Sequence, residues 1–147
     1  ELLKRPELYQ RLKQNPEQLP LAVEEMLRWT CPLHYFRRTA TCDAEVRGQK
    51  IREGDRVVLL YSSANFDEEV FADPMKFDIT RSPNPHMAFG YGIHLCLGAN
   101  LARMEARVFF EEFFARFKGI EPCADPVFIR SNSIHGFKDM PVLLSPA

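Results

Sequence analysis

The chain has 147 residues, a formal net charge of −1 and a hydrophobic fraction of 46%, all of which are ordinary for a globular protein. A charge this close to zero argues against nucleic acid as a main partner. No apolar run is long enough to span a bilayer, and the first residues show no signal-peptide pattern. The four cysteines, Cys31, Cys42, Cys96 and Cys123, form no CxxC pair. Neither a structural zinc site nor a disulfide framework is therefore indicated, and a cytoplasmic protein with reduced thiols is expected.

The first thirty residues predict helices. Residues 1–15 are typical of one or two short helices, interrupted at Pro6 and ended before Pro16, because a residue that precedes proline disfavours the helical conformation. Residues 19–29 predict another helix, which closes at Cys31–Pro32. The chain starts at Glu1, inside helix-like sequence and without an initiator methionine. We therefore expect it to be a piece of something larger.

From Tyr35 onward the composition changes toward β-structure. Three β-rich runs, at 36–46, 49–51 and 56–61, are separated by Gly48 and by the Glu53–Asp55 turn, which predicts a small antiparallel sheet within 35–61. Residues 62–71 form a short segment with helical character. Residues 73–85 contain three prolines and little periodicity, so they predict a long irregular loop of a kind that is often functional.

A long helix is predicted over 97–117. At roughly 100° per residue it carries two apolar stripes on nearly opposite faces: Leu97, Leu101, Met104 and Val108 on one, and Phe110, Phe113, Phe114 and Phe117 on the other. A surface helix needs only one such stripe, so packing on both sides is expected. Residues 127–145 predict a terminal β-hairpin with its turn near His135–Gly136. The expected fold class is mainly α with a small antiparallel β-sheet, that is, α+β.

Cys96 lies where that long helix should begin. Free N–H groups and the helix dipole favour a thiolate there, and Gly90, Gly92 and Gly98 permit close approach of a flat ligand. His94 would place a donor beside an acidic group of the same ligand. A single thiolate with N–H donors in apolar surroundings is what axial haem ligation requires.

Three other interpretations of this segment stay open on the residues alone. A lone cysteine is most often a buried small hydrophobe. The glycines at 90 and 92 suggest a nucleotide-binding loop, although Leu95 stands where its third glycine belongs. Zinc could bind His86, His94 and Cys96, although the usual spacing and fourth ligand are missing.

The stretch FGYGIHLCLGANLAR, from Phe89 to Arg103, resembles the haem-binding signature of the cytochrome P-450 monooxygenases, FGxGxHxCxGxxLAR, and fills each fixed position. The resemblance implies that Cys96 is the thiolate ligand of the iron of haem b and that His94 binds a haem propionate. It also implies that Phe89 shields the thiolate, and that Gly90 and Gly98 leave room for the porphyrin.

Three further features support the resemblance. Glu25 and Arg28 match the family's ExxR motif, and their i, i+3 spacing puts both on one helical face. Arg81 is the implied third member of a salt-bridged triad, since Lys76 replaces the usual arginine in PMKF and lysine cannot form a bidentate fork. Arg38, in FRRTAT, aligns with an arginine that binds the second propionate. The plain alternatives are an exposed helix pair and an ordinary strand arginine.

The resemblance covers nearly the whole chain but only the C-terminal third of the family fold. Residues 1–147 would then be the C-terminal part of a single cytochrome P-450 domain, with the meander and haem-binding loop at 73–96. The distal helix, which delivers protons to bound oxygen, would be missing. The function implied for the complete protein is insertion of one oxygen atom of O2 into a C–H bond of a hydrophobic substrate. The alternative is a non-catalytic haem-binding relic or a truncated product.

The resemblance also suggests substrates and partners. The stretches SSANFDEEVFADP and PNPH resemble the bacterial branch that oxidises sterols and methyl-branched lipids. Substrate contacts are implied at Leu33, His34, Tyr35, Ile134 and His135. Electrons would come from a ferredoxin-type donor with an NAD(P)H-dependent reductase. Arg103 and Arg107, one turn apart, would form part of its docking face, or else a solvated helix face.

Overall fold

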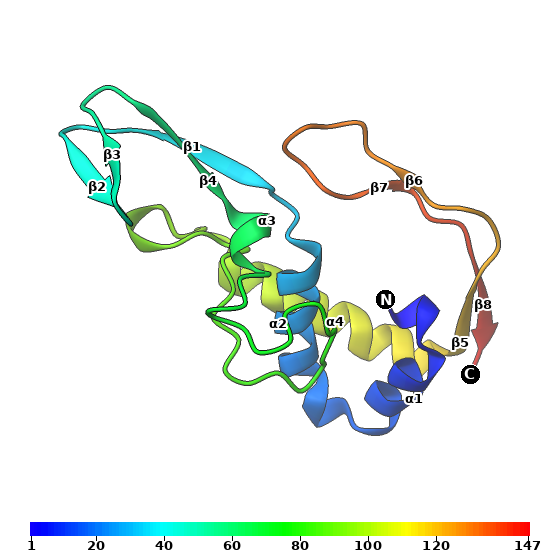
Figure 1. The fold of residues 1–147 in the computed structure, drawn as a ribbon. Coiled ribbons are helices and arrows are strands. Elements are labelled where there is room, and N and C mark those ends of the chain that lie inside the picture. Colours follow the sequence, from blue (N-terminus) through cyan, green and yellow to red (C-terminus); the bar gives the residue numbers. More distant parts are fainter.

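The helices of the protein pack against one another, and two β-arms extend from them (Figure 1). The structure is a computed structural model that describes all of residues 1–147. The helical elements are η1 (Leu2–Lys4), α1 (Pro6–Gln14), η2 (Pro16–Gln18), α2 (Leu19–Thr30), α3 (Tyr61–Ala64), η3 (Gly92–His94) and α4 (Ala99–Arg116). No helix has the length and apolar character needed to cross a membrane.

Proline and local backbone geometry set the ends of the first helices. Pro6 begins α1, where its missing N–H is not needed. Helix α2 ends at Cys31, which adopts the left-handed conformation with φ 38° and donates its N–H to Leu27 O at 3.0 Å. Left-handed residues of this kind commonly end helices. The predicted helix at 19–29 is therefore confirmed to within one residue.

Helix α4 is shorter at both ends than the predicted 97–117. It begins at Ala99 with Gly98 as its N-cap. Glycine is a weak helix former, and residues 97–98 still belong to the turn that contains Cys96. It ends at Arg116 because Phe117 is already extended (φ −128°, ψ 136°) and belongs to strand β5 (Phe117–Pro122). Strand β5 was not predicted. It pairs antiparallel with β8 (Val142–Pro146), which holds Phe117 in the sheet.

The predicted sheet over 35–61 exists as two antiparallel ribbons. Strand β1 (Tyr35–Thr39) pairs with β4 (Arg56–Leu60), and β2 (Ala44–Val46) pairs with β3 (Gln49–Ile51) beyond them. Arg47 and Gly48 both have positive φ, 48° and 80°, as a tight two-residue hairpin turn requires. At the other arm, β6 (Val127–Phe128) pairs with β7 (Phe137–Asp139). The predicted terminal hairpin thus comprises β6 and β7, whereas β8 returns to β5.

The core lies where α1, α2 and α4 meet the irregular 73–85 loop. It contains Tyr9, Leu12, Leu19, Ala22, Val23, Phe77, Ile79 and Phe114. Only the phenylalanine stripe of α4 packs here. The opposite stripe is exposed, with Leu101 at 53% and Met104 at 51%, so only one of the two predicted apolar faces packs within this chain. The mainly α architecture with small antiparallel sheets matches the predicted fold class.

Candidate functional site

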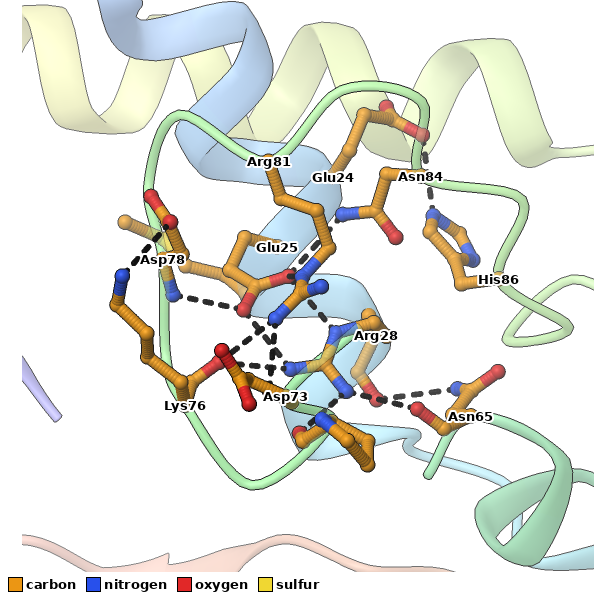
Figure 2. A network of polar contacts seen from close by, with 12 residues as sticks. Glu24, Glu25, Arg28, Asn65, Asp73, Lys76, Asp78, Arg81, Asn84 and His86 are labelled. Carbon is orange, nitrogen blue, oxygen red and sulfur yellow. Dashed lines mark hydrogen bonds and ion pairs between the residues drawn. The ribbon is translucent and has the colours of Figure 1, made fainter. Parts of the chain in front are cut away.

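Glu25, Arg28 and Arg81 meet in a buried ion network beneath the 73–85 loop (Figure 2). Arg28 donates to both carboxylate oxygens of Glu25, from Nε to Oε2 and from Nη2 to Oε1, each at 2.8 Å. Arg81 Nε lies 3.2 Å from Glu25 Oε2. The Glu25 and Arg28 side chains are both fully buried, so the structure brings the three predicted residues together and excludes an exposed helix pair.

The same arginines also bind backbone carbonyls of the loop and of the segment that precedes it. Arg28 Nη1 donates to Asn65 O at 2.7 Å and Pro74 O at 3.0 Å. Arg81 donates to Ala72 O at 2.8 Å and Lys76 O at 3.0 Å. A loop without regular hydrogen bonding needs such partners for its backbone groups, and here guanidinium groups supply them.

Two asparagines complete the network, and sequence reasoning missed both. Asn65 is fully buried. It donates from Nδ2 to Arg28 O at 3.0 Å and accepts from Met87 N at 2.6 Å. Asn84 donates from Nδ2 to Glu25 Oε2 at 3.1 Å. Neither asparagine stands at a spacing that predicts a hydrogen-bond partner. The only signal in the sequence was that each lies in a stretch that resembles the family, SSANFDEEVFADP for Asn65 and PNPH for Asn84.

A second ion cluster joins α2 to the haem-signature segment. Glu24 accepts from Arg103 Nε at 2.6 Å and Nη2 at 2.9 Å, and His86 Nε2 lies 3.0 Å from its Oε2. Burial alone would raise the pKa of Glu24, but Arg103 and His86 hold that pKa below its ordinary value. Burial lowers the pKa of His86. Arg103, for which a docking face or a solvated helix face was expected, is thus ion-paired within the chain.

The Cys96 segment forms a turn that ends at the start of α4. Cys96 N donates to Phe89 O at 2.9 Å and Leu95 N to Gly92 O at 3.0 Å. Cys96 is a free and exposed cysteine, which excludes the buried small hydrophobe. The neighbouring Ile93 and Leu97 are also almost fully exposed, at 98% and 102%. The loop thus presents a sulfur among apolar side chains.

Gly98, Gly90 and Phe89 of the signature differ in their surroundings. A Cβ on Gly98 would lie 3.9 Å from Cys96 Sγ, so its absence keeps space beside the sulfur. Gly90 is instead buried, with φ 72°, and a Cβ there would lie 3.1 Å from Tyr61 Oη. Gly90 is needed for the turn and for Tyr61, and it faces no open surface. The Phe89 ring is half-buried beneath the Arg103 guanidinium, 4.7 Å from its centroid.

His94 and Arg38 both have donors without acidic partners. His94 is exposed and forms no hydrogen bond or ion pair within the chain. Arg38 is half-buried on β1, and its guanidinium donates only to Arg37 O, at 3.0 Å. No contact joins either residue to the other or to Cys96. Each side chain can therefore donate hydrogen bonds to a carboxylate from outside the chain.

The two predicted substrate-contact segments come together. Leu33 forms an antiparallel bridge with Ile134, and the rings of His34 and His135 stack with their centroids 5.2 Å apart. His135 Nδ1 lies 2.8 Å from Thr30 O. Tyr35 begins β1 and pairs with Leu60. Four of the five predicted residues thus form one surface at the base of the β6–β7 arm.

The residues around Cys96 fit a haem. No cluster of three histidine, cysteine or acidic side chains is placed to hold an ion, so the zinc interpretation fails. No strand precedes Gly90, as a nucleotide-binding loop would require. The backbone N–H groups of Leu97 and Gly98 donate to no acceptor in the chain. One sulfur, free amides, exposed apolar side chains and the free side-chain donors of His94 and Arg38 suit an iron porphyrin with acidic groups.

Comparisons with known proteins give the family to which the chain belongs. The cytochrome P450 family model matches residues 1–137. A methyl-branched lipid omega-hydroxylase of Mycobacterium tuberculosis is 51% identical over 127 residues, covering 86% of this chain and 30% of that protein. Cytochrome P450-terp of Pseudomonas sp. is 46% identical over 146 residues, covering 99% and 34%.

A solved structure agrees with these relatives. CYP109E1 of Bacillus megaterium, in complex with testosterone, superposes with a TM-score of 0.92 at 38% identity, covering 96% of this chain and 40% of that one. The chain belongs to the cytochrome P450 family. It corresponds to the C-terminal part of that fold, and it spans about a third of the length of the curated relatives it matches.

Proposed function

We propose that this chain supplies the haem-binding part of a haem-thiolate monooxygenase, which inserts one oxygen atom of O2 into a C–H bond of a hydrophobic substrate. The observation that carries the proposal is the Cys96 sulfur, exposed at the start of α4 within a complete family signature. The buried Glu25–Arg28–Arg81 network, which fixes the loop leading to it, supports the same reading. Membership of the cytochrome P450 family agrees with it.

Each residue of the site has a defined task in this proposal. Cys96 would hold the iron of haem b, and the bound haem would supply oxygen activation. The free N–H groups of Leu97 and Gly98 would donate to the thiolate and moderate its electron donation. His94 and Arg38 would each bind one propionate by charge-assisted hydrogen bonds. Gly98 would leave space beside the sulfur.

The substrate we propose is a sterol or a methyl-branched lipid. One relative is named for a branched lipid, and one matching structure holds testosterone. The surface made by Leu33, His34, Ile134 and His135 combines aliphatic side chains with two imidazoles. Such a surface suits a large apolar molecule with a few polar atoms.

The electron donor we propose is a small ferredoxin with an NAD(P)H-dependent reductase. Arg107, exposed on α4 and 3.5 Å from Glu111, is more accessible to such a partner than Arg103, which Glu24 already binds. The cytoplasmic location stays a prediction.

The test uses the complete protein loaded with haem. Its reduced carbon monoxide complex should show the thiolate-type Soret band. Cys96→Ser should abolish that band, whereas Cys123→Ser, which changes another exposed free cysteine, should keep it. If Cys96→Ser keeps the thiolate-type band, as Cys123→Ser should, the ligand assignment is refuted. Turnover of a panel of sterols and branched lipids, with ferredoxin and reductase, then tests the reaction. A thiolate spectrum without any oxygenated product would favour the non-catalytic alternative.

A further inference from the structure

Two consecutive carboxylates on α2 point to different parts of the molecule. Glu25 belongs to the buried triad, whereas Glu24 lies beside the segment that leads to Cys96 (Figure 2). Glu24 binds one residue before the signature, His86, and one at its end, Arg103. Seventeen positions separate these two partners in the sequence, so a single carboxylate closes the whole signature into a loop.

Both partners of Glu24 border the same aromatic ring. The Arg103 guanidinium lies 4.7 Å from the centroid of the Phe89 ring, and the His86 ring lies 6.1 Å from it. A cation over an aromatic face is attracted to it, and the two-point contact with Glu24 fixes the guanidinium plane in that place. His86 also accepts from Ala88 N through Nδ1, at 3.3 Å.

Phe89 in turn forms a backbone hydrogen bond with Cys96, the proposed iron ligand. Its carbonyl accepts the Cys96 N–H at 2.9 Å. A chain of contacts therefore runs from the Glu24 carboxylate, through Arg103 and His86, to Phe89 and on to the backbone of Cys96. The His86 and Glu24 side chains are only 2% and 25% exposed, so water screens the contact between them weakly.

We propose that Glu24 is a positioning residue for the Cys96 thiolate. It holds Arg103 and His86 against Phe89, and thereby fixes the turn that presents the sulfur to haem iron. The inference rests on the proposed function, because it gives Cys96 the task of binding iron. In Glu24→Gln one acceptor oxygen remains and the negative charge is gone, so the Arg103 fork cannot keep both of its hydrogen bonds and the ion pair is lost. The turn at Phe89 then opens more often.

The test compares Glu24→Gln with Glu111→Gln in the haem-loaded complete protein. Glu111 is a matched control because it pairs with an arginine on the same helix, at 3.5 Å, with both side chains about half exposed. Hydrogen exchange of the Phe89–Leu97 peptide reports the Cys96 N–H directly. Glu24→Gln should accelerate its exchange about tenfold, as loss of charge-assisted hydrogen bonds implies, and Glu111→Gln should leave it unchanged.

A spectroscopic readout separates positioning from general stability. Glu24→Gln should increase the fraction of the reduced carbon monoxide complex with a neutral-thiol-type Soret band, while exchange within α2 stays unchanged. Arg103→Lys keeps the charge but loses the fork, so it should show both effects at smaller size. It serves as the test if Glu24→Gln does not fold.

Two results would overturn the inference: equal exchange of the Cys96 peptide in the Glu24 and Glu111 variants, or faster exchange throughout the protein in Glu24→Gln. If Cys96→Ser retains the thiolate band, the proposed function fails, whatever the Glu24 variant does.

Discussion

Arg28→Lys tests the buried network most directly. Arg28 donates five hydrogen bonds, two to Glu25 and one each to the carbonyls of Asn65, Pro74 and Lys76. Lysine has three donors on a single nitrogen, so at least two of these hydrogen bonds are lost. A hydrogen bond that involves a charged group contributes about 1.5–3 kcal/mol, which gives a loss of about 3–6 kcal/mol in the free energy of unfolding. A whole domain is stable by only about 5–15 kcal/mol.

The measurement is urea unfolding of the haem-loaded complete protein, followed by far-UV circular dichroism. Arg116→Lys is the control, because Arg116 also makes two contacts with one carboxylate, that of Glu112, but is 71% exposed on α4. An exposed helix pair contributes about 0.3–0.5 kcal/mol, so the control should barely shift the midpoint. Equal midpoint shifts at unchanged slope in the two variants would refute the reasoning, since they would show that burial adds nothing to the Arg28 contacts.

Three further outcomes are expected. Gly98→Ala should keep the fold, because φ is −85° there, but weaken haem binding in a titration, because the new methyl lies 3.9 Å from Cys96 Sγ; unchanged affinity would show that the space beside the sulfur is not needed. Iodoacetamide should label Cys42, Cys96 and Cys123 in the haem-free protein but spare Cys31, whose pKa burial raises to about 11; early labelling of Cys31 by mass spectrometry would contradict its burial. Burial also lowers the pKa of His86, which faces Glu24, Glu25 and Arg103. As the pH falls below the ordinary value of 6.5, the unfolded chain therefore binds the proton first and stability decreases, until the folded-state pKa is passed. His86→Gln should flatten that part of the curve of unfolding free energy against pH, and an unaltered slope would assign it to other groups.

The helical part of the fold could be predicted because its signals are local. Pro6, Pro16 and the Cys31–Pro32 step mark helix ends through backbone sterics, which act within a residue or two. Strand β5 could not be predicted in this way. Phe117 continues the apolar stripe of α4, and its extended conformation depends on pairing with Pro146 and neighbouring residues far along the chain. Long-range pairing of this kind leaves no local pattern.

The residues of the site could be predicted where a family motif names them, and not where a contact alone defines them. Glu25, Arg28 and Arg81 follow from motif positions, and the structure joins them. Asn65 and Glu24 carry no such label. Glu24 is one of two neighbouring acidic residues with similar sequence surroundings, and only the packing of α2 against α4 decides which of them meets Arg103.

The departure at Lys76 has a physical explanation in the same network. Its side chain points outward, 66% exposed, and lies 3.5 Å from Asp78 Oδ2. Its carbonyl, however, accepts from both Arg28, at 3.3 Å, and Arg81, at 3.0 Å. The network therefore uses the backbone of position 76, which every residue type supplies, while Arg81 provides the third charge. An arginine is not required at 76 as long as the loop carries that carbonyl to the same place, and this requirement falls on the loop conformation that Phe77 and Ile79 fix in the core.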